Sequence, residues 1–277
     1  MTQSTRRSLA GILVAVVIGA LVAVAGSDGS ATAGPVAVFA LCGILAYAVN
    51  WVVYVPSFLA RTEHYFDLTG SATYLSVTAV ALLLSPDLDA RALIVGGMVI
   101  VWALRLGTFL FRRVRQAGKD GRFDELKTDP LRFLMTWTLQ GLWVLLTMAA
   151  ALAIITGLER EPVGWVAGAG VAMWVAGFAV EVVADGQKSA FKRDPANAGR
   201  FITSGLWSWS RHPNYFGEIT LWVGIALIAL PTLSGWRYVT LISPVSVYLL
   251  IVYVSGVPPL ERRAEARWGD DPDYRAY

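Results

Sequence analysis

"LRFLMTWTLQGLWVLLTMAAALAIIT", residues 131–156, is an apolar stretch in which Arg132 is the only charged residue. A membrane-spanning helix needs about 20 mainly apolar residues with few charges, and this stretch exceeds that length. The chain around it has 277 residues, of which 56% are hydrophobic and 16% charged. That composition is too apolar for a soluble domain of this size. The stretch therefore predicts a transmembrane helix in an integral membrane protein.

Seven further stretches meet the same criterion, at about residues 9–26, 36–60, 71–86, 91–111, 163–184, 215–231 and 237–257. We therefore expect an all-α, polytopic integral membrane helix bundle with seven to eight transmembrane helices, forming one domain over residues 1–277. Arg6 and Arg7 before the first stretch are also typical of a signal peptide. Because "VAVAGSDGSA" (22–31) is a weak cleavage site, we expect this helix to be retained.

The expected loops alternate between many and few basic residues, and this pattern predicts which loops lie on the cytoplasmic side of the membrane. Cytoplasmic loops collect Lys and Arg. Starting from an inside N-terminus, the inside segments, including 112–130, 185–214 and the tail from 258, carry most of them. The outside loops carry only Arg91, Arg160 and Arg237. We expect both termini to be cytoplasmic.

The sequence gives little indication of a metal site, a disulfide bond or a nucleic-acid-binding site. Cys42 is the single cysteine, and His64 and His212 are the only histidines, so no metal-ligand spacing exists. No glycine-rich phosphate motif of soluble nucleotide-binding proteins is present. We expect no metal and no nucleic-acid partner.

"GLWSWSRHPNYFGEI", residues 205–219, places polar chemistry at the start of an apolar stretch. Pro213 suits the first turn of a helix, so the seventh span should begin near Asn214. A helix N-terminus carries partial positive charge, and Arg211 and His212 precede it. Together they predict an anion pocket.

The same stretch offers groups for a flat, polar ligand. Asn214 and Glu218 lie four residues apart, on one helical face, and Trp207 and Tyr215 are able to stack on a ring. An interfacial belt of aromatic residues with snorkelling Arg is the alternative. That alternative leaves Asn214 and Glu218 unexplained.

"VEVVADGQKSAFKRD", residues 180–194, carries Glu181 and Asp185 four residues apart, and Lys188 and Lys192 continue that face. Carboxylates near membrane depth tend to be functional or paired. An acid pair beside a basic run suits ribose hydroxyls next to phosphates. A solvated helix end with salt bridges one turn apart explains the same pattern.

Three further segments carry candidate groups. In "VWALRLGTFLFRRVRQAGKDGRF" (101–123), Arg105 and Arg112 share a helical face, for a phosphate or for snorkelling. The tail "PPLERRAEARWGDDPDYRAY" (258–277), with Glu261, either closes over a cofactor or lies on headgroups. "ARTEHYFDLTGSATY" (60–74) is either a catalytic segment or a polar loop before a helix start at Thr69 or Ser71. Its candidate catalytic residues are Glu63, His64, Asp67 and Tyr74.

Gly164 and Gly168 in "GWVAGAGVAMWVAGF" form a G-x-x-x-G spacing. This spacing lets two membrane helices approach closely, and it predicts helix packing at these two glycines.

"GLWSWSRHPNYFGEI" resembles the signature of bacterial membrane proteins related to the steroid 5-alpha-reductase C-terminal domain. The isoprenylcysteine carboxyl methyltransferases are more distant relatives that share the Arg-His-Pro core. The resemblance covers about 90–277, and "ADGQKSAFK" with "GLW" twenty residues after its Asp keeps the reductase spacing. It implies a bacterial inner-membrane protein that binds NADPH. The implied cofactor-binding residues are Asp185, Lys192, Arg200, Asn214 and Glu218, with Arg105 as a further contact.

The resemblance is weaker on the substrate side. Steroid reductases carry a Gln-Glu pair before a Pro-Ser-Phe, but "WVVYVPSF" (51–58) has Val53 and Tyr54 there, and Trp102 falls near a substrate-side Tyr. We keep Tyr54 as a candidate catalytic residue. The groups that hold a steroid ketone are not evident.

Three functions compete. The first is an NADPH-dependent reductase of a C=C bond in a lipid or steroid-like, hydrophobic substrate taken from membrane lipids. The second is an S-adenosylmethionine-dependent lipid or prenyl methyltransferase that uses the carboxylates around Glu261. The third is a non-enzymatic transporter or assembly factor, which would bind no cofactor. The sequence leaves the oligomeric state open.

Overall fold

The computed structural model describes residues 3–117 and 123–277, without the side chains of 113–117. Part of the expected inside segment 112–130, residues 118–122, lies outside the described residues. Eight helices of the described chain are long and apolar enough to cross a membrane, at Gln3–Gly26, Val38–Leu59, Phe66–Leu84, Ala90–Arg112, Pro130–Thr156, Trp165–Arg193, Pro213–Thr232 and Gly235–Trp268. The prediction of an all-α polytopic membrane bundle is confirmed.

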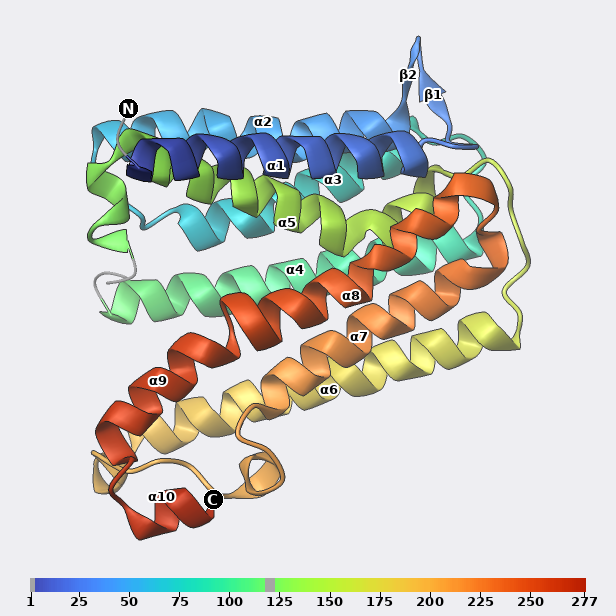
Figure 1. Ribbon diagram of the computed structural model, residues 1–277. Helices are drawn as coiled ribbons and strands as arrows, with labels where there is room; N and C mark the ends of the chain where they lie inside the picture. Colours follow the sequence, from blue (N-terminus) through green and yellow to red (C-terminus); the bar gives the residue numbers. More distant parts are fainter. Residues whose placement is uncertain (1–2, 118–122) are drawn as a thin grey trace. The chain divides into compact units, whose positions relative to one another are not determined.

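The chain forms two compact units, residues 1–163 with 229–242 and residues 164–228 with 243–277. The elements of the first unit are α1 (Gln3–Gly26), β1 (Thr32–Ala33), β2 (Val36–Ala37), α2 (Val38–Leu59), α3 (Phe66–Leu84), α4 (Ala90–Ala117), η2 (Leu126–Thr128), α5 (Pro130–Thr156), η5 (Leu230–Thr232) and η6 (Gly235–Leu241). β1 and β2 pair antiparallel in a two-residue hairpin after α1 (Figure 1).

α5 is the central helix of the first unit and packs against α1, α2, α3 and α4. Its C-terminal half is buried on all sides, with every residue from Thr147 to Thr156 buried. In a membrane, interhelical hydrogen bonds and close packing hold helices together. Here the Tyr47 hydroxyl of α2 donates to the Ala15 carbonyl of α1, at 2.7 Å, and the Trp51 indole donates to the Thr138 hydroxyl of α5, at 3.0 Å.

The three arginines of the expected outside loops bond back to main-chain carbonyls within the first unit. Arg91 and Arg237 are almost completely buried and donate to the carbonyls of Pro162 and Ala153. Arg160 donates to the Ile154 carbonyl, at 3.0 Å. These long cations therefore fasten the loops to the helix ends.

The elements of the second unit are α6 (Trp165–Arg193), η3 (Pro195–Asn197), η4 (Gly205–Ser208), α7 (Pro213–Ala229), α8 (Ile242–Leu249), a π-helical turn η7 (Leu250–Val254), α9 (Val257–Trp268) and α10 (Pro272–Ala276). α6 and α7 lie antiparallel and side by side (Figure 1). α7 begins at Pro213, as predicted, whereas α6 continues nine residues beyond the expected end of its apolar stretch.

Glycine pairs bring the backbones of α6 and α7 into contact. A Cβ added to Gly177 would lie 2.6 Å from the Gly217 carbonyl oxygen, and one added to Gly170 would lie 2.6 Å from the Gly224 carbonyl oxygen. The prediction for Gly164 and Gly168 is wrong: a Cβ there meets nothing within 4 Å. Both residues are exposed, and Gly164 precedes the first residue of α6.

Candidate functional site

The contact between α6 and α7 places the predicted acidic residues next to the start of α7. A Cβ on Gly217 would lie 2.7 Å from the Glu181 main-chain nitrogen, so Glu181 adjoins the turn that carries Asn214 and Glu218. Glu181 and Asp185 are buried, at 2% and 7% exposure, whereas Asn214 and Glu218 are half-buried. Both carboxylates of α6 are therefore buried, and Glu181 lies where α6 contacts α7.

The loop before α7 is fastened to the end of α6. The Trp207 indole donates to the Ala184 carbonyl at 2.9 Å, and the Leu206 amide donates to the Gln187 side-chain oxygen at 3.0 Å. Gly205 makes this possible, because its φ of +62° favours glycine and a Cβ there would lie 2.5 Å from the Gln187 amide nitrogen.

Lys188 lies over the Trp207 ring, with its Nζ 4.2 Å from the ring centroid. Trp207 is buried at 2% exposure, so this indole is part of the packing between the loop and α6. A cation over an aromatic ring is attracted to the face of that ring, and this attraction orders the lysine side chain. Lys188 therefore has a defined position one turn beyond Asp185. Lys192 and Arg200 are exposed.

Arg211, His212 and Glu261 form one network. The Arg211 Nη1 and the His212 Nε2 each lie 2.7 Å from a different oxygen of the Glu261 carboxylate. Arg211 also donates to the Tyr274 carbonyl at 3.2 Å and lies over the Tyr274 ring. The anion that contacts Arg211 and His212 is thus the side-chain carboxylate of Glu261, in the chain's own C-terminal segment.

Glu261 orients the His212 ring, and burial favours its neutral form. Burial lowers its pKa below the usual value; the hydrogen bond and charge of Glu261 oppose this shift, and the charges of Lys188 and Arg211 add to it. With Nε2 donating to Glu261, Nδ1 is the unprotonated nitrogen. This Nδ1 is buried and accepts a hydrogen bond from no described residue. Tyr215 stacks on the ring, with centroids 5.6 Å apart.

The chain's C-terminal segment covers the loop before α7. The Tyr277 hydroxyl donates to the Trp207 carbonyl, and Phe201 packs against Trp268, Tyr274 and Tyr277. A hollow of about 320 Å³ opens beside this cluster, lined by Gly199, Arg200, Phe201, Thr203, Trp268, Asp271 and Asp273. The C-terminal segment therefore packs against the loop that carries Trp207 and Arg211.

The predicted catalytic residues and Arg105 and Arg112 belong to the first unit, and they do not form one cluster. Glu63, at 4% exposure, pairs with Lys127 at 2.7 Å. Tyr54 donates to the Pro130 carbonyl at 3.0 Å and packs against Phe133. Tyr74 packs edge-on against Trp102.

The remaining predicted residues of the first unit are His64, Asp67, Arg105 and Arg112. His64 is exposed and bonds to the Thr62 hydroxyl at 2.9 Å, and Asp67 is half-buried in the first turn of α3. Arg105 lies over the Phe109 ring at 5.3 Å, and Arg112 is exposed.

Sequence reasoning missed four residues that organise these sites: Lys127, Gln187, Tyr274 and Tyr277. Gln187 lies within "ADGQKSAFK", and a glutamine in a helix opposite a Gly-Leu-Trp turn was the available signal. For Lys127 and the two tyrosines, the sequence separation from their partners leaves no local signal.

Comparison with known proteins gives one family. No curated protein and no solved structure shows significant similarity to the chain. The match covers residues 51–277, which run from the second half of α2 to α10 and include all the predicted site residues. The chain belongs to the family described as protein of unknown function DUF1295.

Proposed function

We propose that the chain is a membrane-embedded NADPH-dependent reductase of a C=C bond in a lipid or steroid-like substrate, in a bacterial inner membrane with both termini cytoplasmic. The buried Nδ1 of His212 supports this proposal most directly. Buried polar atoms nearly always have a hydrogen-bond partner. A ribose hydroxyl or a nicotinamide carboxamide would supply the donor that the described residues do not.

The neighbouring charges fit the two kinds of polar group in NADPH. Glu181 and Asp185 are suited to accept from ribose hydroxyls, whereas the Lys188, Lys192 and Arg200 cations are suited to phosphates. Because Lys188 is ordered on Trp207, it would bind a phosphate with little further loss of side-chain freedom. The resemblance to the reductases at Asp185, Lys192, Arg200, Asn214 and Glu218 points to the same cofactor.

NADPH would supply a hydride to one carbon of the C=C bond, and a proton would add to the other carbon. Tyr54, Glu63, His64, Asp67 and Tyr74 stay predictions for the group that supplies this proton. Within the second unit, the tail that carries Tyr277 covers the loop before α7 and would keep water away from the cofactor.

A methyltransferase that uses S-adenosylmethionine is the second candidate, and the Glu261 contacts favour it. Because Glu261 already neutralises Arg211, the site has fewer cations for the several negative charges of NADPH. S-adenosylmethionine carries a sulfonium cation and needs less positive charge around it. The same orphan Nδ1 would accept from its ribose.

Cofactor binding to the purified full chain separates the two candidates. We expect NADPH to bind, S-adenosylmethionine not to displace it, and Asp185→Ala and Asn214→Ala to weaken binding about tenfold or more, since each would remove a hydrogen bond in a partly buried site. Val183→Ala is the matched control, because Val183 is 47% exposed on the same turn of α6. Unchanged NADPH binding in both variants would contradict the reductase, and displacement by S-adenosylmethionine would favour the methyltransferase.

A further inference from the structure

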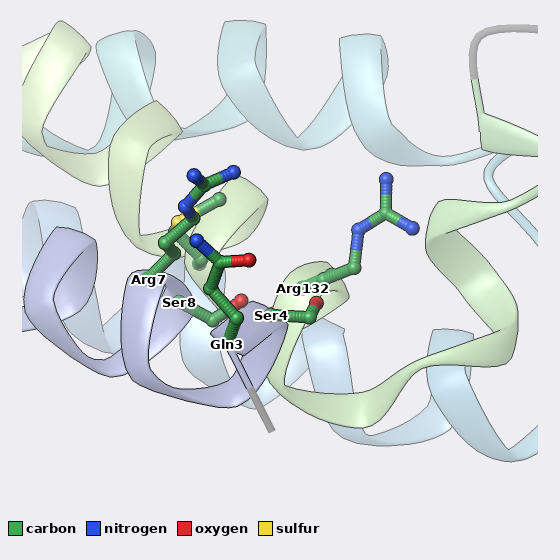
Figure 2. A pocket seen from close by; sticks show the side chains of 6 residues that line it. Gln3, Ser4, Arg7, Ser8 and Arg132 are labelled. Carbon is green, nitrogen blue, oxygen red and sulfur yellow. The ribbon is translucent and has the colours of Figure 1, made fainter. Parts of the chain in front are cut away.

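A second polar site lies in the first unit, between the beginnings of α1 and α5. Here a hollow of about 400 Å³ opens, of a size that holds a small ligand. Figure 2 shows the guanidinium groups of Arg7 and Arg132 extending toward the same side as the Gln3 carboxamide. The hollow is lined by Gln3, Ser4, Arg7, Ser8, Arg132 and Met135.

The floor of the hollow is a close contact between the two helices. A Cβ on Gly11 would lie 2.6 Å from the Met135 sulfur, and Ser8 is buried at 2% exposure. α1 and α5 also form one of the most extensive helix–helix contacts of the unit. The two arginines therefore extend from a fixed backbone and are not carried by a loop.

The groups around the hollow are suited to an anion. Two guanidinium groups, two hydroxyls and one carboxamide contribute donors, and the described lining residues include no carboxylate. The first turn of α1 also has no acidic residue, so its partial positive charge is not offset there. Asp129 caps α5 through the Leu131 and Arg132 amides. The described carboxylate partner of the Arg132 side chain, Glu125, lies 4.0 Å away and is highly exposed, which makes a weak pair.

We propose that this hollow binds the phosphate of an anionic phospholipid headgroup. α1 and α5 are both long and apolar enough to span the membrane, and both begin on the side that the basic residues predict to be cytoplasmic. Basic pockets between transmembrane helices on that side bind anionic headgroups. Arginine pairs well with phosphate because its planar group donates two parallel hydrogen bonds. Met135 offers an apolar wall for the lipid beyond the phosphate. The site is independent of the proposed cofactor site in the second unit.

Native mass spectrometry of the full chain in detergent tests the proposal, with phosphatidylglycerol, phosphatidylcholine and inorganic phosphate as separate probes. We expect phosphatidylglycerol to bind in preference to phosphatidylcholine. Arg7→Gln with Arg132→Gln should weaken binding by roughly 30-fold, since each arginine should contribute about fivefold. Arg6→Gln is the matched control, because Arg6 lies beside Arg7 but does not line the hollow.

Each outcome decides a part of the proposal. Equal binding of the two lipids, or unchanged phosphatidylglycerol binding in the double variant, overturns it. If inorganic phosphate alone binds and the double variant loses it, the phosphate site stands and the lipid source is overturned. Should the double Gln variant not fold, Arg7→Lys with Arg132→Lys keeps both charges and should retain binding within a few-fold. A loss of about 30-fold in this Lys variant overturns the charge argument.

Discussion

The packing of α6 on α7 depends on Gly177, and replacing it with alanine should separate the two helices. The added Cβ would lie 2.6 Å from the Gly217 carbonyl oxygen and 2.7 Å from the Leu221 main-chain nitrogen, and neither backbone atom is able to rotate away. Close carbon–oxygen contacts in proteins begin at about 3.3 Å, so the helices must move apart by about 0.7 Å. Overpacking of this kind costs about 1–3 kcal/mol.

Gly168→Ala is the matched control, because a Cβ there meets nothing within 4 Å and the residue lies on the same helix. Both substitutions gain the same helix propensity of up to about 1 kcal/mol, so their difference isolates the packing cost. At about 2 kcal/mol, Gly177→Ala should melt about 4–8 °C below Gly168→Ala, followed by tryptophan fluorescence in detergent. Equal melting temperatures for the two variants would refute the backbone contact between α6 and α7.

Three other expectations concern charged groups. Lys127→Met strands the buried Glu63 carboxylate and should cost about 3 kcal/mol, measured by thermal unfolding, and Glu63→Gln in the same chain should recover most of that loss. Burial lowers the pKa of His212 in the folded chain. The contribution of His212 to stability is therefore present above the unfolded pKa of about 6.5 and is lost as the pH falls toward the lowered value. His212→Gln should make the melting temperature less dependent on pH over that window, and an unchanged profile would contradict the lowered pKa. Glu261→Gln removes the partly exposed ion pair with Arg211, so it should lower the melting temperature and make it less dependent on salt. If the melting temperature of the variant depended on salt as much as that of the parent chain, the pair would contribute nothing to stability.

Hydropathy predicted all eight spans because apolar length is a local property of the chain. It did not predict how far α6 extends, since a helix continues past the membrane wherever its residues permit. "DGQKSAFKR" permits it up to Arg193. This extension keeps Glu181, Asp185, Lys188 and Lys192 on one helix, as the spacing of the acids and lysines predicted.

The sequence of one helix does not show which of its glycines contact another helix, because that depends on the partner helix. "GWVAGAGVAMWVAGF" contains Gly164, Gly168, Gly170 and Gly177, and several spacings fit a packing motif. The available signal was the match between helices, because Gly170 and Gly177 are seven residues apart, as are Gly217 and Gly224. In an antiparallel pair, equal spacings bring both glycine pairs into contact at once.

The position of Glu261 shows how a break in the last apolar helix serves the candidate site. A π-helical turn ends at Val254, and Gly256 follows; a Cβ there would lie 2.5 Å from the Ile251 carbonyl oxygen. Beyond this interruption, α9 places Glu261 next to Arg211 and His212. Because that carboxylate bonds to Nε2 of His212, the break sets the orientation of the ring and leaves Nδ1 without a hydrogen-bond partner among the described residues.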